Sequence, residues 1–353
     1  MKSRPETMRS VDQLCARALV APERLGELAG VAARYAVAIT PAMADLIDPG
    51  DPLDPIARQF VPDGRELETK PHERRDPIGD DAFSPVEGLV HRYPDRVLLK
   101  VVNACAVYCR FCFRREMIGP GRGGLSPAAF AAALDYIRAH SEIWEVILSG
   151  GDPLVLSARR LKEVVGRLAA IDHVKVIRVH TRLPAVAPER ISTALIRALR
   201  VKDKATFVVL HVNHPRELTK KARAACARFV DAGIPMLSQS VLLRGVNDDV
   251  ETLGALMRAL VECRIKPYYL HHADLAPGTG HLRTTIAEGQ ALMRALRGRH
   301  SGLCQPAYML DIPGGHGKSP IGPNYLSEDG TIVEDFRGRR HSYPPRAAAG
   351  QRK

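Results

Sequence analysis

Three cysteines lie close together about one third of the way along the chain. Cys105, Cys109 and Cys112 form a C-x3-C-x2-C pattern. Three thiolates can hold three irons of a [4Fe–4S] cluster and leave the fourth iron open to another ligand. A ferredoxin or a structural zinc site would normally supply a fourth cysteine or histidine, and none lies nearby. Clustered thiols in a chain without a visible export signal indicate metal or redox chemistry rather than disulfides.

A second candidate site is the run Ser149-Gly150-Gly151-Asp152-Pro153, which follows a short apolar stretch at 146–148. Two adjacent glycines allow the backbone to approach a ligand closely, and Asp152 offers a hydrogen-bond acceptor. A tight turn that begins the next helix is the structural alternative.

A third candidate is the run Asp311-Ile-Pro-Gly-Gly-His-Gly-Lys318 near the C-terminus, which places a lysine after three glycines. A Walker A phosphate loop requires a glycine where Ile312 stands, so the spacing excludes that motif. A glycine-rich surface loop remains the simple alternative.

The elements that must position these residues are short β-branched runs alternating with helical patterns from about residue 96 onwards. This alternation predicts a parallel sheet covered by helices. About six units favour an α/β fold of the partial (β/α)6 barrel type, with an open doubly wound sheet as the alternative. Ligands in both folds bind at the carboxyl ends of the strands. The expected strands are 97–102, 146–148, 174–179, 207–212, 236–243 and 267–270, and the expected helices are 127–138, 158–169, 189–199, 219–231, 250–263 and 286–297.

The flanking regions and the composition add weaker constraints. Residues 1–50 show helical periodicity, and residues 48–90 are rich in Pro, Asp and Gly, which indicates irregular structure. The net charge is +12, but aromatic residues make up only 5%, so an RNA-stacking surface is not expected. Neither a membrane-spanning apolar stretch nor a secretory apolar segment is visible, so we expect no membrane partner and a cytoplasmic location.

The cysteine segment, with Phe111 before the third cysteine, resembles the radical S-adenosylmethionine (SAM) signature. The resemblance implies that SAM binds the open iron and is cleaved to a 5′-deoxyadenosyl radical. Gly150, Gly151 and Asp152 look like the superfamily's motif for the methionyl amine of SAM.

Over residues 85–326 the chain resembles the lysine 2,3-aminomutase family, in which pyridoxal phosphate (PLP) is a second cofactor. The resemblance implies that Lys318 forms the Schiff base with PLP and that Gln239 contacts SAM. Arg92, Tyr93 and Arg96 match the segment that binds the PLP phosphate, which suits cationic groups and a hydroxyl. His316 departs from the pattern, since the family has a glycine there, and its side chain could contact the cofactor.

The same resemblance implies a free amino acid as the substrate. Arg114 matches the arginine that binds the substrate carboxylate, and Asp274 and Asp311 match the pair that binds the ε-ammonium of lysine. The implied enzyme is an isomerase that converts L-lysine to β-lysine by 2,3-migration of the amino group. Two aspartates disfavour glutamate, the alternative amino acid substrate.

The chain departs from the longer family members at the structural zinc site. Asp249 stands where they have a cysteine, and no cysteine follows Cys304, so we expect a short form without zinc. We divide it into an N-terminal helical and irregular extension (1–90), a catalytic core (91–326) and a basic C-terminal tail (327–353).

Other readings remain open. The chain also resembles a sister group that makes β-lysine for elongation factor P, and an Fe–S regulator that binds nucleic acid is the non-enzyme alternative. The enzyme reading implies a flavodoxin or ferredoxin as electron donor and a homo-oligomer.

Overall fold

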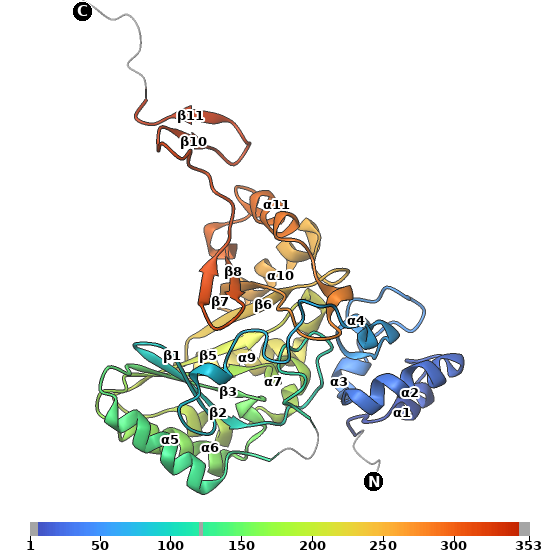
Figure 1. Ribbon diagram of the computed structural model, residues 1–353, viewed down its shortest axis with the longest axis vertical. Coiled ribbons are helices and arrows are strands. Elements are labelled where there is room, and N and C mark those ends of the chain that lie inside the picture. Colours follow the sequence, from blue (N-terminus) through green and yellow to red (C-terminus); the bar gives the residue numbers. More distant parts are fainter. Residues whose placement is uncertain (1–5, 120–122, 346–353) are drawn as a thin grey trace, which may run out of the picture.

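A nine-stranded sheet forms the centre of the molecule (Figure 1). The structure is a computed structural model that describes residues 6–119 and 123–345. The strands follow one another in chain order, β2 to β8 are parallel, and β1 and β9 pair antiparallel at the two edges. Their bounds are β1 Leu89–Tyr93, β2 Arg96–Val102, β3 Glu145–Gly150, β4 Val176–Thr181, β5 Ala205–His211, β6 Met236–Leu242, β7 Ile265–His272, β8 Ala307–Ile312 and β9 Gly317–Pro320.

Six main helices, one after each of β2 to β7, connect the parallel strands, and the four-residue helix α7 Leu183–Val186 lies between β4 and β5 in addition; the predicted (β/α)6 arrangement is confirmed. The strand β8 adds a seventh parallel strand that the apolar runs did not reveal. A Ser, Thr or Asp side chain caps the first turn of each main helix by accepting a hydrogen bond from its backbone, which explains where these helices begin. The main helices are α5 Pro127–Ala139, α6 Ala158–Ala169, α8 Thr193–Leu199, α9 Lys220–Asp231, α10 Val250–Glu262 and α11 Ile286–Leu296.

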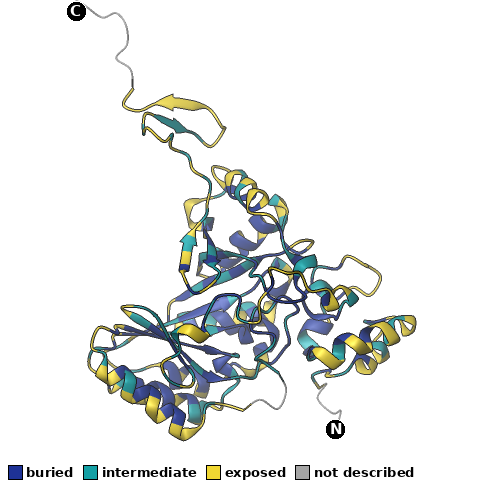
Figure 2. Ribbon diagram, in the orientation of Figure 1, coloured by how far each residue is buried: buried dark blue, intermediate teal, exposed yellow. Residues whose placement is uncertain are grey.

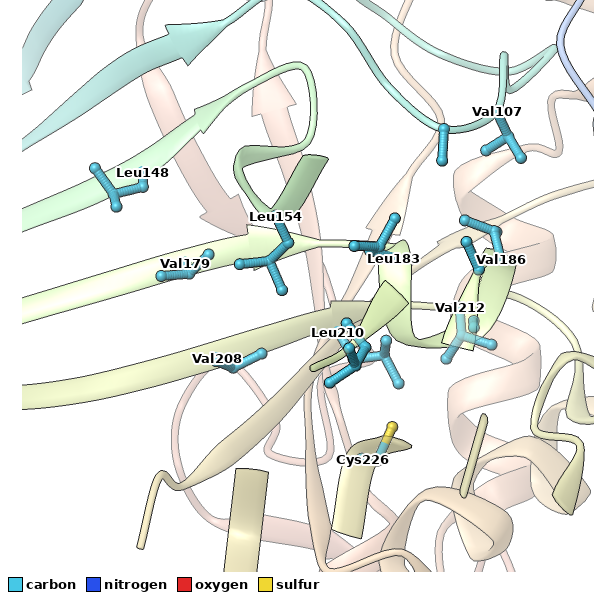
Figure 3. Close-up of a cluster of buried hydrophobic side chains, with 14 of the residues drawn as sticks. Val107, Leu148, Leu154, Val179, Leu183, Val186, Val208, Leu210, Val212 and Cys226 are labelled. Atoms are coloured by element: carbon cyan, nitrogen blue, oxygen red, sulfur yellow. The ribbon is translucent and has the colours of Figure 1, made fainter. Parts of the chain in front are cut away.

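The apolar core lies between the sheet and these helices (Figure 2). Figure 3 draws one part of it, where Val179 and Leu210 of the sheet belong to the same buried cluster as Val107. Val107 lies between two of the clustered cysteines, so the core holds the cysteine loop in place. Cys226, also in this cluster, is a buried hydrophobic residue, as expected for an isolated cysteine.

The N-terminal extension contains four short helices beside the barrel (Figure 1): α1 Val11–Ala16, α2 Leu25–Arg34, α3 Pro41–Ala44 and α4 Ala57–Phe60. The predicted division at residue 90 falls inside β1. Beyond the barrel, β10 Ile332–Glu334 and β11 Arg340–Ser342 form a hairpin that projects away from it, within the region predicted as a basic tail. Positions 346–353 of that tail lie outside the described residues. Among the described residues, no helix is long and apolar enough to cross a membrane.

Candidate active site

One cavity of about 720 Å³ occupies the interior of the barrel, and every predicted site residue lines it. The three cysteines come from the loop after β2, and the glycine run begins at the last two residues of β3 and continues into the loop that follows. Gln239 lies on β6, and its side chain makes no hydrogen bond with the described part of the chain, so its amide is available to a ligand. Figure 1 shows the strands that bring these distant segments together.

The N-terminal extension clamps the cysteine loop through one buried carboxylate. Glu66 is fully buried and pairs with both Arg110 and Arg115, and Arg110 Nε donates to its Oε1 at 2.8 Å. Arg182 Nη1 donates to Cys109 Sγ at 3.0 Å from the opposite side. The loop is therefore fixed before any cofactor binds.

The three clustered thiols are buried in surroundings that disfavour their ionised form. Burial raises the pKa of all three, to about 11 for Cys112, so they need a positive metal centre to persist as thiolates. No three His, Cys, Asp or Glu side chains in the described residues are close enough to share a single metal ion. A four-iron cluster does not require such convergence, because each thiolate binds its own iron.

The glycine run packs against the backbone of the cysteine loop. The Gly151 N–H donates to Val102 O at 2.5 Å, and the Asp152 N–H donates to Ala104 O at 3.0 Å. A Cβ atom on Gly151 would lie 2.2 Å from Ala104 O, so only glycine permits this approach. These glycines place the two loops next to each other, which the sequence alone did not show.

Asp152 lines the cavity, and its side chain is held by hydrogen bonds from the protein around it. Its carboxylate accepts hydrogen bonds from Thr181 Oγ1 at 2.7 Å, from Arg182 N at 2.8 Å and from Leu183 N at 3.0 Å. Four donors, including Leu154 N, occupy its oxygens. Asp152 thus positions the loop after β4, which carries Arg182.

Lys318 lies on the edge strand β9, directly across from Asp311 on β8. Its ammonium pairs with the Asp311 carboxylate, and its backbone N–H donates to the Tyr93 hydroxyl at 2.7 Å. Lys318 therefore lines the cavity with its amine next to Asp311 and its backbone next to Tyr93. His316, by contrast, is exposed and does not line the cavity, so it leaves room for a cofactor at Lys318.

Asp274, just after β7, faces the same part of the cavity as Asp311. Burial and the nearby charge of Asp311 raise the pKa of Asp274 to about 7, although Lys318 and Arg114 favour its ionised form. Asp311 is also 3.8 Å from Arg92 Nη1. The two aspartates thus lie close enough for the charge of one to affect the ionisation of the other.

Asp80 is a residue of the cavity that the sequence did not single out. It is buried, and its carboxylate accepts hydrogen bonds from two arginines that are predicted to bind PLP and the substrate. The donors are Arg92 Nη2 at 2.7 Å and Arg114 Nη2 at 2.8 Å. Burial opposes ionisation of Asp80, but the two arginines outweigh it and lower its pKa. Asp80 lies in the Pro- and Gly-rich segment 48–90, where nothing in the sequence distinguishes it from other turn aspartates.

The segment predicted to bind the PLP phosphate lies at the cavity wall, with its cations already partnered. Arg96 pairs with Asp95 at 2.7 Å and stacks 3.8 Å from the centre of the Tyr93 ring, while Arg92 pairs with Asp80. The Nε atom of Arg92 is buried without a hydrogen-bond partner in the described structure, so it retains a donor for an anionic ligand.

Three histidines at strand ends also line the cavity and were not predicted. They are His180, His211 and His271, and burial lowers the pKa of each well below its usual value. The imidazoles are therefore neutral at physiological pH. The sequence signal that could have identified them was a histidine at or directly after the carboxyl end of each apolar run.

Comparison with known proteins agrees with this geometry. The sequence model of the radical SAM superfamily matches residues 99–256, and that of the C-terminal part of lysine 2,3-aminomutase matches residues 293–351. The second match includes the hairpin β10–β11. The chain is therefore a radical SAM protein.

Individual relatives identify the family within the radical SAM superfamily to which the chain belongs. The chain is 42% identical to the L-lysine 2,3-aminomutase of Clostridium subterminale over 86% of its own length and 73% of the relative's. It is 37% identical to the L-lysine 2,3-aminomutase of Escherichia coli K12, over 83% of this chain and 86% of the other. The glutamate 2,3-aminomutase of Clostridioides difficile is 38% identical over 85% of this chain and 71% of its own length. The chain belongs to the lysine 2,3-aminomutase family, an isomerase family whose cofactors are a [4Fe–4S] cluster, SAM and PLP.

Proposed function

We propose that this enzyme converts L-lysine to β-lysine by moving the α-amino group to C3. The observation that carries the proposal is the pairing of Asp311 with an alkylammonium group, that of Lys318, beside the second carboxylate of Asp274. This part of the cavity has the charge and the hydrogen-bond acceptors that a second lysine side chain, that of the substrate, requires. The relatives named L-lysine 2,3-aminomutase support the same substrate.

The chain's own residues would hold the two ends of the substrate. Asp274 and Asp311 would bind the ε-ammonium, and Arg114, freed in part from Asp80, would bind the carboxylate. Lys318 and Tyr93 would position PLP, and Cys105, Cys109 and Cys112 would hold the cluster. When bound, these cofactors supply hydrogen-atom abstraction and stabilise the substrate radical, while the cavity excludes water.

Glutamate fits this site poorly. Its side-chain carboxylate would lie against Asp274 and Asp311, and like charges in a low-dielectric cavity repel strongly. The glutamate-specific relative makes a direct comparison necessary, because its overall identity to this chain is similar.

The experiment is anaerobic reconstitution with iron, sulfide, PLP, SAM and dithionite, followed by lysine or glutamate in separate reactions. We expect β-lysine and no β-glutamate by mass spectrometry. Asp311→Asn should lower kcat/KM for lysine about 100-fold, since removal of one partner of a buried charge pair costs about 3 kcal/mol or more. Formation of 5′-deoxyadenosine without β-lysine would reject the substrate while retaining the radical SAM chemistry.

The proposal includes a cytoplasmic location and a homo-oligomeric enzyme. A cytoplasmic location suits a cluster held by free thiols, because reducing compartments keep thiols available. A homo-oligomer is supported by exposed Phe336 and Tyr343 on the projecting C-terminal segment, whose side chains are 55% and 66% exposed. Native mass measurement of the holoenzyme tests the oligomeric state.

A further inference from the structure

A second cavity, of about 660 Å³, lies on the outside of the molecule behind the cysteine loop. We call it the outer groove, and its walls come from the region of α3, from the 3-10 helix Pro188–Arg190 and from α9. None of the residues predicted to bind a cofactor or the substrate lines it.

The wall between the outer groove and the barrel cavity is one residue thick at the cysteine loop. Ala106, the residue after Cys105, lines both cavities. The wall is also thin at a second place, where Val186 lines the barrel cavity and the next residue, Ala187, lines the outer groove. The residues that form the wall at these two points, Ala106, Val186 and Ala187, have small apolar side chains. Cys105 is a predicted cluster ligand, so the groove is a short route for an electron to the cluster.

The outer groove carries more positive than negative charge. Arg190, Lys221 and Arg228 line one side and are exposed. Two carboxylates line the outer groove. Asp45 is paired with Arg17 at 2.9 Å, so among the described residues Glu189 is the one carboxylate of the groove without an ion pair. The side chain of Lys221 makes no ion pair or hydrogen bond among the described residues, so its ammonium is available to a partner. Such a surface attracts an acidic protein and speeds its association.

We infer that the outer groove is the docking site for a small acidic protein that donates single electrons to the cluster. One electron leaves the reduced donor and takes the cluster from the 2+ to the 1+ state, and no atom or proton is transferred. The inference rests on the radical SAM assignment of the proposed function and is independent of the amino acid substrate.

The test compares two reductants and measures 5′-deoxyadenosine, so that failure of the lysine proposal does not affect it. The reconstituted Arg190→Glu, Lys221→Glu double variant is assayed with reduced flavodoxin and, separately, with dithionite. We expect the flavodoxin concentration for half-maximal rate to rise about tenfold, because charges at the rim of an interface control association. The rate with dithionite, which needs no docking, should stay unchanged.

A matched control reverses two exposed charges on other elements, Arg258→Glu and Arg299→Glu, neither of which lines the outer groove. This control should behave as the native protein with both reductants. A zero-length carbodiimide crosslink from Lys221 to flavodoxin should form in the native enzyme and be lost in Lys221→Arg, which keeps the charge and the rate. Unchanged flavodoxin dependence in the double variant, or an equal loss with dithionite, would overturn the docking site.

Discussion

The hydroxyl of Tyr93 accepts a hydrogen bond of 2.7 Å from the backbone N–H of Lys318. Tyr93 ends β1 and Lys318 lies on β9, so this bond joins the two edge strands of the sheet across the open side of the barrel. Gly317 fits against the same tyrosine, since a Cβ atom there would lie 3.0 Å from the hydroxyl oxygen. The residue predicted to bind PLP is therefore positioned by the closure of the barrel itself.

Tyr93→Phe should weaken PLP binding about tenfold. The substitution removes an exposed hydrogen bond that fixes the backbone at Lys318, and such a bond contributes about 0.5 to 1.5 kcal/mol. A titration followed by PLP absorbance measures the affinity. Tyr136→Phe removes a hydroxyl that contacts His91 outside the cavity, and it should bind PLP as the native protein does. Equal affinity in Tyr93→Phe and the native protein would show that this bond does not position Lys318.

The raised pKa of Asp274, about 7, predicts a pH dependence of substrate binding. Below that pH Asp274 is protonated in the free enzyme, and a cationic side chain binds its ionised form. Thus kcat/KM for lysine should fall as the pH drops below about 7, by up to tenfold per pH unit. The cavity histidines titrate well below this range.

Asp274→Asn should remove this acid limb and leave a low, flat profile between about pH 6 and 8. A pH profile of kcat/KM with saturating cofactors makes the comparison. The same limb in the variant would assign the titration to another group.

Gly151→Ala should prevent assembly of the cluster. The added Cβ would meet Ala104 O at 2.2 Å and displace the cysteine loop. Iron content after anaerobic reconstitution measures the effect, and we expect less than half of the native value. Gly166→Ala is the matched control, because its Cβ would meet nothing within 4 Å on the exposed side of α6. That control should retain full iron and gain up to about 1 kcal/mol in stability. Full iron in both variants would contradict the packing argument.

The contact of Arg182 with Cys109 predicts control of the cluster's reduction potential. The guanidinium is held by Glu217 at 2.7 Å and by Gln59 at 2.6 Å, so its N–H stays directed at the sulfur. A cationic donor stabilises the more negative, reduced cluster. Arg182→Met should therefore lower the potential by about 60 mV, the equivalent of roughly 1.4 kcal/mol for one electron.

A redox titration monitored by electron paramagnetic resonance measures this shift. Arg182→Lys keeps the charge and should give an intermediate value. Arg178→Met, at the pair with Glu145 in another part of the cavity, should leave the potential unchanged. A potential that does not move in Arg182→Met would remove Arg182 from the control of the cluster.

The sequence predicted the parts of the site that local patterns encode. The cysteine spacing, the glycine run, Lys318 and the six strand–helix units are local, and the structure brings all of these site residues to one cavity. Asp80 could not be predicted, because its role depends on two arginines that only the folded chain places beside it. The hydrogen bonds of Asp152 could not be predicted for the same reason, since its four donors come from the last residue of β4, from the two residues after it and from its own turn. The strand β8 did not stand out as an apolar run because its six residues contain a tyrosine and an aspartate within the apolar pattern, although Asp311 was expected at a strand end.

The most direct test of the account follows the nitrogen itself. Reconstituted enzyme is incubated with lysine labelled with ¹⁵N at the α-amino group, and the product is analysed by ¹⁵N and ¹³C nuclear magnetic resonance. The account predicts β-lysine with the label on C3 and an unlabelled ε-nitrogen, with no label lost to ammonia. Recovery of lysine labelled only at C2, with 5′-deoxyadenosine still formed, would contradict the assignment of this chain as a lysine 2,3-aminomutase.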